Sequence, residues 1–270
     1  MSNIMARFLA WLIVLLTAFF GRWRRLTILA RLYSLLAPQT SITVNGTAFS
    51  LFTPDRRSVY WPRHGFASEP NTLTWIDGFA AGDVFYDIGA NVGAYTIYAA
   101  KRKGIRVVAL EPNPFSFHAL VRNLELNRLM ELVTPLCLAL DDTTKPAALV
   151  LGGCESGTVG NRLSRDGDAG NAAPHTLNTL AYSLDDLIAG TGLPLPSHVK
   201  LDVDGIEPEI LLGAAAILAD RRLKSVMVEF DTHEKAVQEG IQNMMTAGGL
   251  KAAESGEGDG SANRLYIRTP

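Results

Sequence analysis

The sequence contains few of the residues that build disulfide or zinc sites. It has five histidines and only two cysteines, Cys137 and Cys154, among 270 residues. Neither cysteine belongs to a C-x-x-C pair, and their spacing fits no zinc site. We interpret them as free thiols in a reducing compartment, so a disulfide-stapled or zinc-dependent fold is not expected.

A strong net charge is also lacking. The formal net charge is −2 at pH 7, which gives no global electrostatic basis for binding nucleic acid, and we expect no nucleic-acid partner. Apolar residues make up 47% of the chain, enough for a sizeable buried core, and no internal repeat is evident. The length favours one large α/β domain with a smaller addition rather than two full domains.

The dinucleotide fingerprint G-x-G-x-x-G is absent, but a related pattern occupies Asp83 to Glu111. Apolar β-formers at 84–86 predict a strand, and a glycine turn follows. Residues 93–103 then favour a helix, and 107–110 a second strand that ends at Glu111. Strand, glycine turn, helix, strand and acidic residue is the order of a nucleotide-binding βαβ unit.

The turn itself has features that discriminate between ligands. Gly89 and Gly93 form G-x-x-x-G, with Asp87 before them and Asn91 between them. Gly89 permits a sharp turn and close approach of a ligand, Asn91 tolerates cap geometry, and Gly93 allows close helix packing. A carboxylate at Asp87 would repel a pyrophosphate but suits the ammonium group of S-adenosylmethionine. Glu111 is placed to accept hydrogen bonds from a ribose diol. The alternative is an ordinary βα turn with a solvated aspartate, and an NAD-dependent dehydrogenase is disfavoured by the spacing.

A third strand is predicted at Val133–Leu140, and Asp141 and Asp142 follow it. A carboxylate at that strand end can accept a hydrogen bond from an adenine amino group. Capping of the following turn is an equally good interpretation of the two residues taken alone.

The first 40 residues differ from the rest of the chain. Phe8 to Gly21 carries no charge but is shorter than the roughly 20 residues of a membrane span, and Arg22, Arg24 and Arg25 follow it. A signal peptide is disfavoured, because no cleavage site follows and the arginines oppose translocation. A buried structural helix competes with our preferred interpretation, a membrane-associated helix over residues 4–37. Its charge asymmetry predicts a cytoplasmic catalytic domain tethered to the inner face of the cytoplasmic membrane.

Several further elements can be placed from local patterns. Asn45-Gly46 predicts a β-hairpin over Ser41–Phe52, and Asn71–Phe79 reads as a capped helix. Gly152–Thr176 is polar and rich in glycine, so we expect either a mobile substrate lid or disorder. Helices are predicted at Leu180–Ile188 and Glu207–Arg221.

The combined motifs resemble the FkbM-type methyltransferases from about Ser41 to the C-terminus. One departure is Asp204, where the family more often has glutamate. The matching segments are the 25 residues from Glu69, E-P-N-P at Glu111, L-x-x-N-L-x-L-N at Leu120, A-L-D-D at Ala139, S-L-D-D-L at Ser183, V-K-L-D-V-D-G-I-E at Val199, V-E-F at Val228 and N-R-L-Y-I-R at Asn263.

The resemblance implies a class I methyltransferase fold, α/β and Rossmann-like, with a mostly parallel, doubly wound seven-stranded sheet. It also implies methyl transfer from S-adenosylmethionine, usually to a hydroxyl of a sugar, glycan, lipid-linked or secondary-metabolite acceptor. By position, it assigns the cofactor turn to Asp87, Gly89, Asn91 and Gly93, the ribose to Glu111, and the adenine to Asp141 or Asp142. We divide the chain into an N-terminal helical segment (1–40), a hairpin with a capping helix (41–80) and the methyltransferase domain (81–270).

The catalytic candidates are acids at predicted strand ends. Asp202, Asp204 and Glu229 are the chosen residues, and Asp202 is also expected at the cofactor. An alcohol must lose a proton during methylation, which calls for a base or a metal; Lys200 and His233 are weaker candidates. Four carboxylates, with Glu207 as the fourth, could hold a magnesium-like cation, but we predict no metal site. The competing hypothesis is a catalytically inactive cofactor-binding module.

Overall fold

The computed structural model describes residues 2–164, 175–230, 234–253 and 263–269. Within them the chain forms two compact units, Met1–Pro38 and Gln39–Pro270. The first unit contains two helices, α1 (Ser2–Thr17) and α2 (Arg22–Leu35). Among the residues that the structure describes, no helix combines the length and apolar character of a membrane span.

The second unit is built on a seven-stranded sheet in the order β12-β13-β11-β10-β3-β4-β5. The strands β11, β10, β3, β4 and β5 are parallel, and β13 runs antiparallel to both of its neighbours. The predicted mostly parallel seven-stranded sheet is therefore confirmed. Its strands are β3 (Val84–Ile88), β4 (Arg106–Leu110), β5 (Val133–Leu136), β10 (His198–Leu201), β11 (Ser225–Glu229), β12 (Leu250–Ala252) and β13 (Asn263–Arg268).

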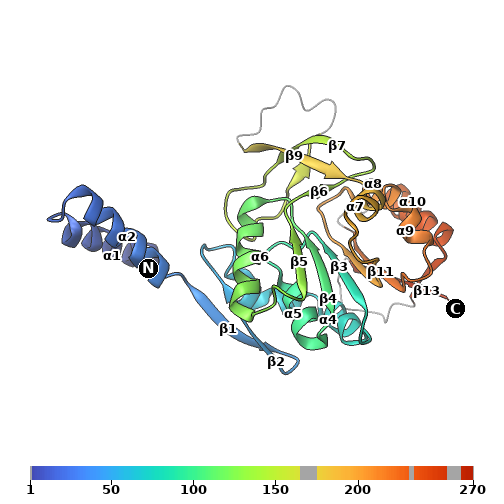
Figure 1. The fold of residues 1–270 in the computed structure, drawn as a ribbon, viewed down its shortest axis with the longest axis horizontal. Coiled ribbons are helices and arrows are strands. Elements are labelled where there is room, and N and C mark those ends of the chain that lie inside the picture. The colour runs from blue at the N-terminus through green and yellow to red at the C-terminus, as the bar shows by residue number, and fades with distance from the viewer. Residues whose placement is uncertain (1, 165–174, 231–233, 254–262, 270) are drawn as a thin grey trace. The chain divides into compact units, whose positions relative to one another are not determined.

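Helices cover both faces of this sheet (Figure 1). Alternate residues of β3 point to opposite faces, as in any strand. Tyr86 belongs to the apolar cluster that includes α7–α10, and Phe85 to the cluster that includes α4–α6. These helices are α4 (Pro70–Asp77), α5 (Ala94–Lys103), α6 (Pro114–Asn127), α7 (Leu184–Thr191), α8 (Glu207–Leu212), α9 (Ala215–Ala219) and α10 (Lys235–Ala247).

The predicted hairpin around Asn45-Gly46 is confirmed as β1 (Gln39–Val44) and β2 (Thr47–Phe52). The side chains of Asn123 and Asn127, one turn apart on α6, bind its second strand. The Asn123 Oδ1 accepts from the Phe52 backbone amide at 2.5 Å, and the Asn127 Nδ2 donates to the Ser50 carbonyl at 2.7 Å. The two asparagines thus attach the hairpin to the domain core.

Between the hairpin and α4, the polar, proline-containing stretch from Thr53 to Pro70 is predicted from the sequence as a loop. It contains a π-helix, η1 (Trp61–Gly65), and a short helix, α3 (Phe66–Ser68). Phe66 packs in the core beside Phe49, at a ring separation of 5.4 Å. The helix that follows begins at Pro70 rather than at Asn71, because proline fits the first helical position.

A second, four-stranded sheet was not expected. It has the order β6-β9-β7-β8 and consists of β6 (Ala139–Leu140), β7 (Lys145–Val150), β8 (Arg162–Leu163) and β9 (Thr176–Tyr182). In Figure 1, β7 and β9 lie beyond one end of the main sheet. The single strand predicted at Val133–Leu140 is wrong, because its second half pairs with β9 instead of β4.

Two helix predictions also need correction. Residues 180–182 belong to β9, and α7 begins only after Ser183, whose hydroxyl accepts from the Asp186 amide. The helix predicted at Glu207–Arg221 is broken into α8 and α9, with Gly213 between them. A Cβ at Gly213 would lie 2.3 Å from the Asp141 carbonyl oxygen, so the break brings the chain against another loop.

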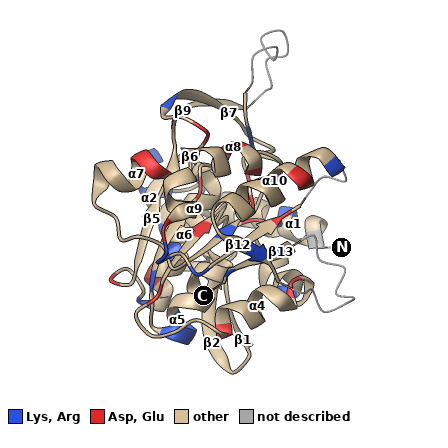
Figure 2. Ribbon diagram, turned by 90° about the vertical axis from the view of Figure 1, so that its right-hand side faces the viewer, with Lys and Arg blue, Asp and Glu red and all other residues tan. Residues whose placement is uncertain are grey.

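The helix ends carry charges that suit the helix dipole. Figure 2 shows acidic residues on α7, where Asp185 and Asp186 occupy the first turn, and basic residues on α5, whose last turn contains 101–103. The segments at 165–174, 231–233 and 254–262 are outside the described residues. They include residues 165–174 of the predicted lid, His233, and the glycine-rich segment Glu254–Gly260, for which the sequence predicts a turn.

Candidate functional site

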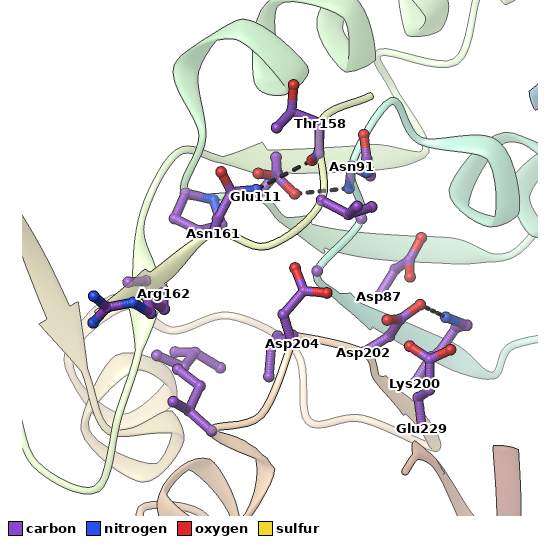
Figure 3. Close-up of a pocket in the computed structure, with 18 of the residues that line it drawn as sticks. Asp87, Asn91, Glu111, Thr158, Asn161, Arg162, Lys200, Asp202, Asp204 and Glu229 are labelled. Carbon is purple, nitrogen blue, oxygen red and sulfur yellow. Dashed lines mark hydrogen bonds and ion pairs between the residues drawn. The ribbon is translucent and has the colours of Figure 1, made fainter. Parts of the chain in front are cut away.

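A cavity of about 400 Å³ lies at the carboxyl ends of the parallel strands. Seven of the ten chosen residues line it: Asp87, Gly89, Asn91, Glu111, Asp202, Asp204 and Glu229. Figure 3 shows Glu111 and Asn91 at one side of this space and Asp87, Asp202 and Lys200 at the other. Carboxyl ends of neighbouring parallel strands meet at one edge of a sheet, and ligands of such folds bind there.

The turn after β3 lies at the point where the strand order reverses, between β3 and β10. Gly89 has a φ of +82°, and a Cβ on it would stand 1.7 Å from the backbone oxygen of Asp202. Asn91 also has a positive φ, 51°, which asparagine tolerates better than most residues. The backbone of this turn thus requires glycine at 89, and it brings the two strand ends together.

Glu111 follows β4 and is buried, with 4% of its surface exposed. Its two carboxylate oxygens accept the backbone amides of Asn91 and Asn113, each at 2.8 Å. Burial raises the pKa of Glu111 to about 7, against the lowering effect of these two amides. Each oxygen has a second lone pair that can accept from a ligand.

A buried ammonium group lies among carboxylates on the opposite side of the cavity. Lys200 is 2% exposed, and its Nζ donates to the Asp202 carboxylate. A Glu69 oxygen lies 4.0 Å from the same nitrogen, and Lys200 is the register partner of Asp87 on β3. Burial would lower the pKa of Lys200, but these carboxylates hold it above its usual value. The raised pKa favours the charged ammonium form of Lys200.

The pKa values of the two acids nearest Lys200 shift in opposite directions. Burial raises the pKa of Asp87, although Lys200 and a 2.5 Å hydrogen bond from the Thr96 hydroxyl oppose the shift. Burial acts the same way on Asp202, but Lys200 and a hydrogen bond with Glu229 outweigh it and lower the pKa of Asp202. Asp202 is thus an ionised carboxylate with a quarter of its side chain exposed.

Sequence reasoning missed two residues of this side of the cavity, Glu69 and Tyr95. Both line it, and Tyr95 is 3% exposed with the Lys200 ammonium 5.1 Å from its ring centre. The Tyr95 hydroxyl makes no hydrogen bond of normal geometry with the described residues. Burial raises its pKa, and the nearby Glu69 carboxylate adds to the shift. Glu69 opens the matching family segment, which was the available signal; Tyr95 gave none.

The described part of the predicted lid also lines the cavity, through Thr158, Val159, Asn161, Arg162 and Leu163. Hydrogen bonds hold this segment at both sides. The Asn161 Oδ1 accepts from Asn113 at 3.0 Å, and the Gly160 amide donates to Asp204 at 2.7 Å. The Asp204 side chain therefore positions the segment. The aromatic residues Tyr60 and Trp61 close another part of the wall.

Three chosen residues do not line the cavity. Gly93 is the N-cap residue of α5, and a Cβ on it would lie 3.1 Å from the Leu120 side chain. Asp141 and Asp142 both bind the Lys145 ammonium, at 3.1 and 2.7 Å, and their assignment to adenine stays a prediction.

Glu207, the fourth carboxylate considered for a cation, accepts a hydrogen bond from the Gly205 amide at the start of its own helix. Among the described His, Cys, Asp and Glu residues, no group of three is arranged to hold a metal ion.

Three comparisons place the chain among known proteins. It is 29% identical over 136 residues to the hexuronic acid methyltransferase AglP of Haloferax volcanii, covering 48% of this chain and 49% of that protein. It is 28% identical over 197 residues to the 31-O-demethyl-FK506 methyltransferase FkbM of Streptomyces tacrolimicus, covering 64% of this chain and 75% of that one. A tRNA (guanine(37)-N(1))-methyltransferase of Anopheles darlingi is 42% identical over 93 residues, 34% of this chain and 17% of that enzyme. The chain thus spans half or less of two of these relatives.

Solved structures resemble the chain more weakly. A methyltransferase FkbM from Methylobacillus flagellatus has a TM-score of 0.48 and 16% identity over 70% of this chain and 44% of that one. The putative methyltransferase yhhF of Escherichia coli also scores 0.48, at 13% identity over 85% and 98% of the two chains. TM-scores below 0.5 do not contribute to the family assignment. The model of the methyltransferase FkbM domain, however, matches residues 87–247, more than half of the chain. The chain belongs to the FkbM methyltransferase family.

Proposed function

We propose that the protein transfers a methyl group from S-adenosylmethionine to a hydroxyl oxygen of a sugar, glycan, lipid-linked or secondary-metabolite acceptor. One observation carries the proposal: Glu111 and the ionised Asp202 line opposite sides of the same cavity. The family match and two relatives support it, since their names specify a hexuronic acid and a demethylated hydroxyl position as acceptors.

The residues present suit S-adenosylmethionine, which supplies an electrophilic methyl group on a sulfonium. The Gly89 turn leaves space that a Cβ would fill, and the buried Asn91 Oδ1 has no hydrogen-bond partner among the described residues. Glu111 would accept from the ribose hydroxyls through its free lone pairs. Asp87 and Asp202 supply negative charge for the ammonium and sulfonium groups.

Asp202 is the residue that we propose to receive the acceptor's proton. Methylation of a neutral alcohol makes its proton strongly acidic as the new bond forms, so even a carboxylate with a lowered pKa can accept it. Lys200 and Glu229 would hold Asp202 in place, and Asp204 would position the segment at 158–163. Positioning of acceptor and donor in line supplies most of the remaining rate.

Calorimetry on the full chain tests the cofactor assignment. We expect S-adenosylhomocysteine to bind and NAD to give no heat. Glu111→Ala should weaken binding strongly, by about 10-fold or more, because it removes an acceptor for two hydroxyl donors. No binding of S-adenosylhomocysteine would overturn the proposal, and unchanged binding to Glu111→Ala would remove the ribose assignment.

Methyl transfer from labelled S-adenosylmethionine tests the acceptor class. We expect label on a glucuronic acid-terminated oligosaccharide and a fall of about 100-fold or more in turnover for Asp202→Asn, with cofactor affinity nearly kept. Transfer to tRNA instead would overturn the hydroxyl acceptor and our prediction that no nucleic acid binds. Binding of the cofactor with no transfer to any hydroxyl acceptor would favour the inactive binding module.

A further inference from the structure

The unit Met1–Pro38 has a large apolar surface and almost no interior. Among its described side chains, from residue 3 onward, Thr17 alone is buried. Large apolar side chains face outward instead: Phe19 is 89% exposed, Trp23 76% and Leu16 62%. Large apolar side chains exposed in this number, when they gather in one patch, mark a site that a membrane or another protein covers.

The charge of the same unit has one sign. Its charged side chains are Arg7, Arg22, Arg24, Arg25 and Arg31, and the first acidic residue of the chain is Asp55. The whole chain, by contrast, has a formal net charge of −2. A partner that covers this unit must therefore offer both apolar contact and negative charge.

The exposed aromatic residues of this unit indicate which kind of partner covers it. Trp11, Trp23 and Tyr33 are all more than half exposed, and the Arg22 guanidinium lies 5.4 Å from the Trp23 ring centre. Tryptophan and tyrosine concentrate at the level of lipid headgroups, where one end of the ring is apolar and the other wet. Arginines beside them would meet the phosphates of the same headgroups.

We infer that α1 and α2 form a docking element for a bilayer surface that contains anionic lipids. A helical element with apolar and aromatic side chains on its surface and arginines as its sole charges is the composition of interfacial membrane anchors. A second copy of the chain fits less well, because it would bring five arginines against five arginines. The inference does not depend on the methyl donor site.

Vesicle partitioning of the full chain tests the inference. We expect binding to vesicles of phosphatidylcholine mixed with phosphatidylserine, weakened by salt, and little binding to phosphatidylcholine alone. The variant Arg22→Gln/Arg24→Gln/Arg31→Gln should lower the partition coefficient on the order of 100-fold, since each arginine near an anionic surface contributes roughly fivefold. All three side chains are exposed, so folding should not change.

A matched control replaces three exposed arginines of the other unit, Arg56, Arg106 and Arg221, with glutamine. This control should bind the anionic vesicles as the wild type does. Equal loss in the control, equal binding to neutral vesicles, or no binding to either vesicle would overturn the inference.

The apolar contribution needs its own variant. Phe19→Ser/Trp23→Ser should reduce partitioning at least 10-fold, because two large side chains lose their place in the headgroup region. Quenching of tryptophan fluorescence by brominated lipids should be seen in the wild type. If the full chain instead forms a lipid-free dimer that Phe19→Ser/Trp23→Ser dissociates, the surface belongs to a second copy and the inference fails.

Discussion

The Cα of Gly89 packs against the backbone carbonyl of Asp202, so closely that a Cβ on residue 89 would stand 1.7 Å from that oxygen. The contact joins the turn after β3 to the end of β10, where the two halves of the sheet diverge. A backbone contact thus sets the spacing between the cofactor turn and the proposed catalytic acid.

Gly89→Ala should destabilise the fold and abolish binding of S-adenosylhomocysteine. The new methyl group would overlap a carbonyl in a left-handed backbone conformation, at a cost of about 2–4 kcal/mol. Gly104→Ala is the matched control, because its φ of +65° is similar but nothing lies within 4 Å of the added carbon. It should cost about 1 kcal/mol. Urea unfolding measures both, and equal losses would contradict the close contact.

The affinity for S-adenosylhomocysteine should rise with pH through neutrality. The pKa of Glu111 is raised to about 7, and only the ionised carboxylate accepts fully from a ribose diol. Binding should therefore be about tenfold weaker at about pH 6 than at about pH 8, with a proton released near neutrality. Calorimetry in buffers of different ionisation enthalpy measures both effects. Glu111→Gln should bind weakly at every pH, and a pH effect that persists in it would assign the titration to another group.

Lys200→Met should destabilise the protein by about 3–5 kcal/mol, because Asp87 and Asp202 would lose their buried counterion. Without the ammonium, the pKa of Asp87, which is already raised, rises further, and the pKa of Asp202 rises above its unfolded value. Their contribution to stability is then present at low pH and lost as pH rises, so the deficit should shrink in acid. Thermal unfolding against pH measures this. Lys251→Met, at an exposed position, should show neither effect.

Two tyrosines on α5 should respond differently to loss of the hydroxyl. Tyr95→Phe should leave the free energy of unfolding within about 0.5 kcal/mol, since its hydroxyl has no good partner among the described residues. Tyr98 donates to Asp77 at 2.8 Å, and Tyr98→Phe should cost about 1 kcal/mol. If the Tyr95 hydroxyl serves a ligand, Tyr95→Phe alone should weaken ligand binding. A larger stability loss for Tyr95→Phe would show that the hydroxyl is already bonded in the free protein.

The βαβ core could be predicted because its signals are local. The strand, the turn at Gly89 and the position of Glu111 depend on residues within 30 positions of one another, and the structure places them as expected. The cavity acids Asp202 and Glu229 were also found, since each ends or follows a strand that is buried on both faces. Parallel strands direct such residues to the same edge.

The second sheet could not be predicted from the same signals. Leu180 to Tyr182 has apolar residues at a spacing that also fits a helix, and pairing with β7 decides the outcome. Ala139 and Leu140 were predicted as the end of the third strand, but the chain leaves the main sheet after Leu136 and these two residues pair with β9 in the second sheet. Glu69 and Tyr95 meet Lys200 only after distant elements fold together. No local pattern marks Tyr95, and the family segment that begins at Glu69 does not show that this residue faces Lys200.

The hydrogen bonds of the Asn123 and Asn127 side chains to β2 also affect how this strand can pair with other chains. A hairpin of two strands normally presents free backbone groups that can pair with another chain. Here the amides of Ser50 and Phe52 and the carbonyl of Ser50 are already taken by carboxamide groups. The two asparagines of the L-x-x-N-L-x-L-N segment therefore occupy backbone groups of β2 that a neighbouring strand would otherwise bind. This edge is then not available for intermolecular β-pairing and aggregation.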